Sequence, residues 1–264
     1  MEIQGLQVFE RPAKPRSEGM TWCIDDGAPT DWFRDVIRSY HRLIDGVKFG
    51  WGTALVTDDL DAKVAACRQY RVDYCFGGTL FEAYWVQRRL DAFFQLLETY
   101  RCPVVEISDG TVHLSAKDRR HIIRDFKAHL RVFSEVGSKN PEESSHWTAE
   151  DWVRRIMEDR ESGSDVVILE ARESGTIGLY LPSGEIRRDV ARGILSSSLD
   201  PRWLMFEAPQ KAQQVYWIRR IGPGVNLSNI PLQGSLNLET LRLGLRSDTF
   251  DLLTHASPIV AEGS

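Results

Sequence analysis

The sequence predicts an α/β domain of the (β/α)8 TIM-barrel class. Two observations support this prediction: short apolar runs rich in β-branched residues alternate with helical patterns, and the alternation continues along almost all of the 264 residues. Strands separated by helices of roughly ten to twenty residues pair in parallel through right-handed crossovers. About eight such units fit a (β/α)8 barrel better than an open doubly wound sheet. No G-x-G-x-x-G motif follows the first predicted strand, which is further evidence against a doubly wound dinucleotide-binding sheet.

The predicted strands are apolar runs that end in a turn or in charged residues. In chain order they cover residues 20–25, 46–50, 72–76, 103–108, 132–136, 165–171, 203–207 and 225–230. The sixth is the clearest, because the run Val166-Val167-Ile168-Leu169 is followed at once by Glu170 and Arg172. Alternation with period two places Ile168, Glu170 and Arg172 on one face. A buried strand that ends in charge needs either partners or a ligand.

The predicted helices combine a 3.6-residue apolar period with capping residues at their ends. They cover residues 31–44, 58–70, 81–100, 115–130, 148–162, 185–199, 209–221 and 238–245. The run Thr148-Ala149-Glu150-Asp151 is typical of a capped helix start. We expect one domain over residues 1–264, with an irregular lead-in at 1–18 and a loosely ordered tail at 251–264.

Composition narrows the class of function. The net charge of -5 and the pI near 5.7 argue against a general nucleic-acid binder. No apolar run approaches the roughly 20 residues of a membrane span, and no apolar segment typical of a secretory signal follows the N-terminal charges. The four cysteines lack a C-x-x-C spacing, which favours reduced thiols over a zinc site or disulfides. We therefore expect a soluble, cytoplasmic protein.

Acidic residues gather where the predicted strands end, which is where barrels of this class hold their active sites. The carboxylates of Glu106, Glu135, Glu170 and Glu207 come from consecutive units and should converge on one mouth. Because like charges repel, a divalent cation is the simplest remedy, and an all-oxygen set suits Mg²⁺ better than zinc. The structural alternative is a network in which each acid pairs with a cation. The available cations are Arg172, Lys48, Lys139 and Lys211.

Cations and neutral polar groups fall at the same strand ends. Lys48, Arg172 and Lys211 could hold a phosphate or carboxylate together with Gln210, Asn226 and Ser228, since the loops after the last two strands commonly bind phosphate. A solvated lysine is the alternative for Lys211. No histidine lies at a predicted strand end, which leaves lysine and carboxylate for proton transfer. The residues thus indicate a magnesium-assisted enzyme acting on a phosphorylated carboxylic acid.

Several strand ends form longer runs: VKFGWGT at 47–53, GGTLFE at 77–82, EISDG at 106–110, RESG at 172–175, FEAPQK at 206–211 and LRLGLRSDTF at 241–250. Through these runs the chain resembles the phosphosulfolactate synthase family from about residue 14 to 250. The resemblance implies a (β/α)8 barrel and Mg²⁺-dependent addition of sulfite to the methylene carbon of phosphoenolpyruvate, with the phosphate retained. It leaves the oligomeric state open, a homo-oligomer included.

Candidate roles follow from the strand ends and the resemblance together. The catalytic candidates are Lys48, Lys139 and Glu82. The substrate-binding candidates are Asp25, Thr79, Ser108, Arg172, Gln210, Lys211, Asn226 and Ser228. The metal candidates are Glu106, Glu135, Glu170 and Glu207.

Two positions depart from the family pattern. Relatives carry Asp-Lys-Gly after the first strand and Gly-Lys-Lys after the fifth, whereas this chain reads Asp25-Asp26-Gly27 and Gly137-Ser138-Lys139. Two cations are lost and one anion is gained, which should repel sulfite. An alternative hypothesis is therefore the same barrel using phosphoenolpyruvate with an organic nucleophile in a secondary-metabolite pathway. A non-catalytic, stress-associated relative is a third hypothesis, against which the full set of strand-end acids argues.

Overall fold

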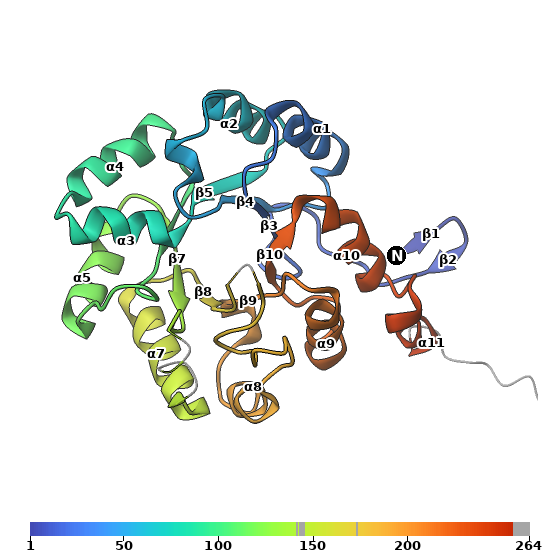
Figure 1. Ribbon diagram of the computed structural model, residues 1–264. Coiled ribbons are helices and arrows are strands. Elements are labelled where there is room, and N and C mark those ends of the chain that lie inside the picture. Colours follow the sequence, from blue (N-terminus) through green and yellow to red (C-terminus); the bar gives the residue numbers. More distant parts are fainter. Residues whose placement is uncertain (141, 143–145, 173, 256–264) are drawn as a thin grey trace, which may run out of the picture.

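Eight short parallel strands form the centre of the structure, and helices surround them (Figure 1). The computed structural model describes residues 1–140, 142, 146–172 and 174–255. The strands are β3 (Thr21–Asp25), β4 (Gly46–Phe49), β5 (Asp73–Phe76), β6 (Val104–Ile107), β7 (Arg131–Val136), β8 (Val166–Leu169), β9 (Leu204–Glu207) and β10 (Leu227–Pro231). They are hydrogen-bonded in the order β5-β4-β3-β10-β9-β8-β7-β6, and the two outer strands contact each other. The predicted barrel is confirmed.

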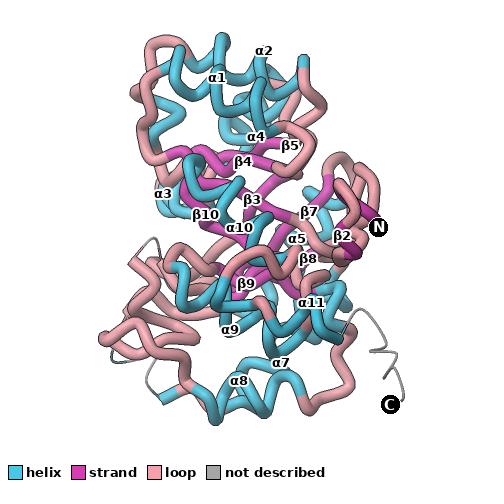
Figure 2. The backbone as a smooth tube through the Cα atoms, turned by 90° about the vertical axis from the view of Figure 1, so that its right-hand side faces the viewer, coloured by secondary structure: helices cyan, strands magenta, loops and turns pink. Residues whose placement is uncertain are grey.

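Helices cover the outside of the barrel, with α1 and α2 on one side of the strands and α7 and α8 on the other (Figure 2). They are α1 (Thr30–Tyr40), α2 (Leu60–Gln69), α3 (Gly78–Val86), α4 (Leu90–Thr99), α5 (Ala116–Lys127), α7 (Ala149–Ser162), α8 (Arg188–Leu195), α9 (Lys211–Ile221) and α10 (Ser235–Arg242). The predicted start of α7 is confirmed, because Thr148 and Asp151 form a reciprocal capping box.

Other boundaries differ from the prediction. The single helix expected at 81–100 is two helices, α3 and α4, because Arg88 takes a left-handed conformation (φ 57°) in an exposed polar stretch. The lead-in contains a hairpin of β1 (Glu2–Ile3) and β2 (Leu6–Gln7), so it is not wholly irregular. The first residues of the expected tail form α11 (Asp251–His255). Residues 256–264, and Glu173 of the RESG run, lie outside the described residues.

The barrel interior is apolar toward the amino ends of the strands and charged toward their carboxyl ends. Its apolar layer is formed by Met20, Trp22, Cys75, Val104, Phe133, Val166, Ile168 and Met205. Register shows which neighbours share this face: Lys48 is paired with Cys75, Glu106 with Phe133, and Glu135 with Ile168. At the carboxyl ends of β4, β6, β7, β8 and β9, this alternation turns charged side chains inward, beyond the apolar layer. This arrangement concentrates charge at one mouth of the barrel.

Candidate active site

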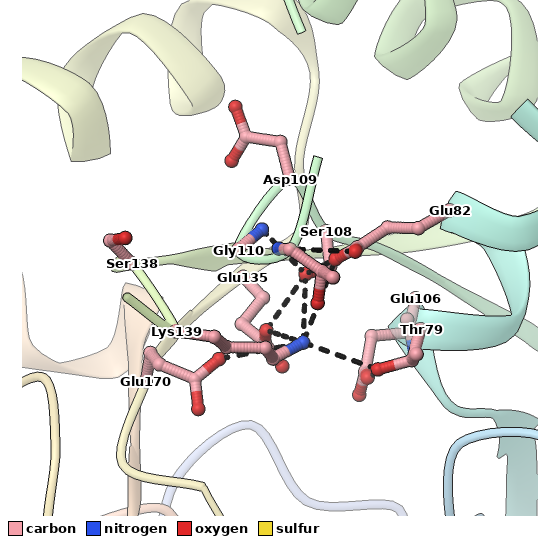
Figure 3. Close-up of polar contacts among 12 residues, drawn as sticks. Thr79, Glu82, Glu106, Ser108, Asp109, Gly110, Glu135, Ser138, Lys139 and Glu170 are labelled. Atoms are coloured by element: carbon pink, nitrogen blue, oxygen red, sulfur yellow. Dashed lines mark hydrogen bonds and ion pairs between the residues drawn. The ribbon is translucent and has the colours of Figure 1, made fainter. Parts of the chain in front are cut away.

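A cavity of about 280 Å³ opens at the carboxyl ends of the strands; we call it the carboxyl-end cavity. Eight of the predicted site residues line it: Lys48, Thr79, Glu106, Glu135, Lys139, Glu170, Arg172 and Glu207. Glu82 and Ser108 are buried directly beside them through hydrogen bonds and ion pairs (Figure 3). The structure therefore brings together predicted site residues from the strand ends of six units of the barrel.

Lys48 on β4 is the first of two cations in this cavity. Its Nζ donates to Oε1 of Glu207 at 2.9 Å and lies 3.4 Å from Glu106 Oε2 and 3.9 Å from Glu135 Oε2. Burial alone would lower the pKa of Lys48, but the carboxylates of Glu106, Glu207 and Glu135 raise it well above its ordinary value. Lys48 is therefore a fixed ammonium group and not a general base.

Lys139, in the loop after β7, is the second cation. Its Nζ lies 3.0 Å from Glu135 Oε1, 3.6 Å from Glu82 Oε1 and 3.7 Å from Glu170 Oε2 (Figure 3). It also donates to the hydroxyl groups of Thr79 and Ser108. Burial would lower its pKa, but the Glu135 and Glu170 carboxyls raise it. The loop holds this side chain over the mouth, where it lines the carboxyl-end cavity.

Ser108, just after β6, lies between two acids. Its Oγ is 2.6 Å from Glu82 Oε1 and 2.8 Å from Glu135 Oε1. A hydroxyl group has one hydrogen, so Ser108 can donate to only one of them at a time. Glu82 is further held by the backbone N–H of Thr111 at 3.1 Å.

Glu135 and Glu170 form a pair with opposite pKa shifts. Burial would raise the pKa of Glu135, but Lys139 and a hydrogen bond with Glu170 lower it. Burial and the Glu135 charge raise the pKa of Glu170 well above its ordinary value. Oε2 of Glu170 accepts no hydrogen bond within the described part of the chain, although Lys139 Nζ lies 3.7 Å from it. The two directions place the proton of this pair on Glu170 and leave Glu135 ionised.

Glu106 is the third acid with a perturbed pKa. Its Oε1 accepts a hydrogen bond of 2.6 Å from the N–H of Gly78. A Cβ at Gly78 would lie 2.5 Å from Cβ of Ser108, so only glycine allows this approach of the backbone. Burial is the largest influence on Glu106 and raises its pKa to about 7, in spite of Lys48.

The carboxylates suit Mg²⁺ in chemistry, although they are held by lysines. An all-oxygen set matches a hard cation, and Oε2 of Glu170 accepts no hydrogen bond within the described residues. Among the described residues, no three His, Cys, Asp or Glu side chains stand ready around a common metal position. An ion would have to take over contacts that Lys48, Lys139 and protons now make. The magnesium site stays a prediction.

Two of the predicted binding residues, Asp25 and Asn226, do not reach the cavity. Asp25 lies on the outward face of β3, and Asn226 lies just before β10 begins. Asp25 is paired with Phe49 in register, so it faces outward, where its Oδ2 binds Lys63 at 2.6 Å. Asn226 precedes the first residue of β10 and lies at the amino end of the barrel. There its Oδ1 accepts from the N–H of Met20 at 2.9 Å and its Nδ2 donates to Leu204 O at 3.1 Å.

Three further candidates lie near the mouth but outside the cavity lining. Gln210 is the N-cap of α9 and donates to Ser174 O at 2.7 Å. Lys211 is half-exposed and pairs with Asp248 at 2.8 Å, in agreement with its solvated alternative. Ser228 is paired in register with Glu207 and is buried, and its Oγ has no hydrogen-bond partner in the described ranges.

The two family departures also lie outside the lining. Asp26 is exposed, and neither it nor Ser138 is among the residues around the cavity. Figure 3 shows Ser138 apart from the cluster, and its Oγ accepts from the N–H of Asn140 at 3.1 Å.

The structure adds lining residues that the sequence did not single out: Ile24, Trp51, Thr111 and Asn229, with the glycines Gly77 and Gly78. Asn229 is the most informative. It is 3% exposed, takes a left-handed conformation (φ 54°), and its Oδ1 has no partner among the described residues. The irregular register between Leu227 and Ile230 produces this turn of the side chain. Its position directly after the candidate Ser228, near the end of a predicted strand, was the feature of the sequence that could have pointed to it.

Comparison with known proteins identifies the family. The model of the (2R)-phospho-3-sulfolactate synthase (ComA) family matches residues 9–248. The chain belongs to the phosphosulfolactate synthase family. It is 45% identical to a phosphosulfolactate synthase of Bacillus subtilis over 94% of this chain and 98% of the relative. It is 36% identical to one of Methanocaldococcus jannaschii, over 93% and 99%.

Solved structures of distant sequence share the fold. A 3-hexulose-6-phosphate synthase superposes with a TM-score of 0.53 at 11% identity, over 90% of this chain and 99% of that one. A 3-keto-L-gulonate-6-phosphate decarboxylase of Vibrio cholerae gives 0.53 at 11%, over 91% and 100%. Within the described residues, no helix is both long and apolar enough to span a membrane.

Proposed function

We propose that this protein catalyses the Mg²⁺-dependent addition of sulfite to phosphoenolpyruvate, giving 2-phospho-3-sulfolactate. Membership of the phosphosulfolactate synthase family supports the reaction. The observation that carries it to this chain is the cluster of two buried lysines among five acids at the mouth of the barrel. A non-catalytic relative would have no need of so costly an arrangement of buried charge.

The cavity suits a small, multiply anionic substrate. Lys48 and Lys139 supply point charges from two sides, and Arg172 supplies a guanidinium at the rim. Arg172 is positioned by its Nη2, which donates to Lys139 O at 2.6 Å. The remaining N–H groups of Arg172 can bind a phosphate or carboxylate in a bidentate manner.

Magnesium would be held by Glu135 and Glu170, with Glu106 and Glu207 nearby, and would supply Lewis-acid charge to the substrate carboxylate. In the reaction, the sulfur lone pair of sulfite forms the C–S bond at the methylene carbon. The electrons of the double bond move toward the carboxylate, and the neighbouring carbon then takes up a proton. Lys139 is the proposed donor, because its ammonium faces the cavity and Ser108 links it to Glu82 for reprotonation.

The test is to incubate the protein with Mg²⁺ and phosphoenolpyruvate, with and without sulfite, and to follow phosphorus NMR and mass. A sulfite-dependent product that contains both the phosphate and the sulfonate is expected. The Lys139→Met variant should bind phosphoenolpyruvate more weakly than wild type and form no product even at saturating phosphoenolpyruvate. Wild-type protein that yields no sulfonate, or that releases inorganic phosphate in step with sulfite consumption, would contradict the proposal.

The organic-nucleophile alternative rests on Asp26 and Ser138. Because neither lines the cavity, we favour sulfite. The Asp26→Lys/Ser138→Lys double variant separates the two: it should change the sulfite KM only modestly. Sulfite-dependent turnover that appears only in the double variant would support the alternative instead.

A further inference from the structure

A second cavity, of about 500 Å³, lies at the opposite mouth of the barrel. Residues at the starts of strands form it: Asp45 precedes β4, Asp73 begins β5, Pro103 precedes β6 and Arg131 begins β7. We call it the amino-end cavity. Its floor is apolar and includes Trp22, whose ring lies 4.9 Å from that of Phe133 in the barrel interior. It shares no residue with the carboxyl-end cavity.

The amino-end cavity is strongly cationic in a chain whose net charge is -5. Its lining contains two acids, Asp45 and Asp73, and six cations: Lys14, Arg16, Arg68, Arg71, Arg101 and Arg131. Both acids are already paired, Asp45 with Arg16 at 2.9 Å and Asp73 with Arg131. Four cations therefore remain without an acidic partner in this lining.

Some of these cations have structural roles. Lys14 donates to the carbonyl oxygens of His41 and Ile44, and Arg68 donates to Tyr74 Oη at 2.8 Å. Arg71 and Arg101 differ. Both are exposed, and neither side chain makes a hydrogen bond or ion pair within the described chain. Each follows the C-cap of a helix, α2 or α4, with φ of 54° and 46°, at a position where glycine is usual.

We propose that the amino-end cavity binds a small molecule that carries two or more phosphate groups. Guanidinium groups bind phosphate oxygens in pairs, and four excess positive charges match such a ligand. The apolar floor accommodates an uncharged part of the ligand, and the volume falls in the range of small-molecule sites. The helix dipole explains why one cation lies at the C-terminus of each helix, but it does not explain why six cations line the amino-end cavity. This inference does not depend on the proposed reaction.

Arg88 provides a matched control. It is also an exposed arginine after a helix C-cap, that of α3, with φ of 57°, but it lies outside the amino-end cavity. The experiment is calorimetric titration of inorganic pyrophosphate into magnesium-free wild type, Arg71→Ala/Arg101→Ala and Arg88→Ala. The single charge reversals Arg71→Glu and Arg101→Glu serve if the double variant does not fold.

We expect the double variant to bind pyrophosphate at least about 10-fold more weakly than wild type, and Arg88→Ala to bind as wild type does. Pyrophosphate can also enter the carboxyl-end cavity, so the difference between variants locates the site. Wild type that does not bind, a double variant that binds equally well, or an equal loss in Arg88→Ala would each overturn the proposal.

Discussion

Lys48 and Glu207 face each other across the mouth of the barrel, and their side chains are joined by a hydrogen bond of 2.9 Å between Nζ and Oε1. They come from β4 and β9, which are not neighbours in the sheet. The second oxygen of Glu207 accepts from the N–H of Ala171 at 2.8 Å, so the same carboxylate fixes the end of β8. The Lys48–Glu207 pair therefore ties together the carboxyl ends of β4, β8 and β9 at the mouth of the barrel.

Replacing Lys48 with methionine should cost stability as well as activity. The change leaves buried carboxylates without their cation, which typically costs about 3–5 kcal/mol of the free energy of unfolding. Urea denaturation measures this loss, and the Lys48→Met/Glu207→Gln double variant should recover part of it. Lys211→Met is the control, because its half-exposed pair with Asp248 should contribute almost nothing. Equal effects of the two lysine substitutions would contradict this account of the cluster.

Ser108→Ala tests the link between Lys139 and the two acids. The variant should lower kcat by up to about 100-fold and shift the pH profile of kcat, because Glu82 and Glu135 lose their common partner. The control is Ser138→Ala, whose hydroxyl lies away from the cluster. A kcat that falls without any change in the pH profile would reduce Ser108 to a packing role.

The pKa of Glu106 predicts a dependence of stability on pH. The pKa is raised from 4.5 to about 7 in the folded protein, so between these values the folded state holds a proton that the unfolded chain has lost. Stability from this group is complete below pH 4.5 and is lost as the pH rises through 7. Relative to Glu106→Gln, metal-free wild type should lose up to about 3 kcal/mol over this window. Parallel pH profiles for the two proteins would contradict the shift.

Magnesium should stabilise the protein through Glu170. At a concentration of 100 times its Kd, a ligand specific for the folded state adds about 2.7 kcal/mol, and EDTA should remove that gain. Glu170→Gln should abolish most of the stabilisation, whereas Asp26→Asn, an exposed acid at the same end of the barrel, should keep it. A gain that survives in Glu170→Gln would place the ion elsewhere.

The sequence was sufficient to predict the barrel and the cluster of acids at the strand ends. In a strand, successive side chains point to opposite faces, so the alternation of residue types shows which side chains face inward. It failed where one residue decides the end or the face of a strand. Asn226 lies one position before β10 and therefore at the opposite mouth of the barrel. Asp25 is paired in register with Phe49 and, like it, faces outward. The inward turn of Asn229 depends on an irregular register that no local pattern specifies.

Asn229→Gly should separate function from stability. Glycine adopts a φ of 54° without strain, so the variant should be as stable as wild type or gain up to about 1 kcal/mol. It loses the amide that lines the cavity, and the KM for phosphoenolpyruvate should rise by about 10-fold, the value of one good hydrogen bond. Arg88→Gly is the control, since it relieves the same backbone conformation outside the cavity and should leave the kinetics unchanged. Wild-type kinetics in Asn229→Gly would show that the unpartnered Oδ1 serves only the bend in β10 and not the substrate.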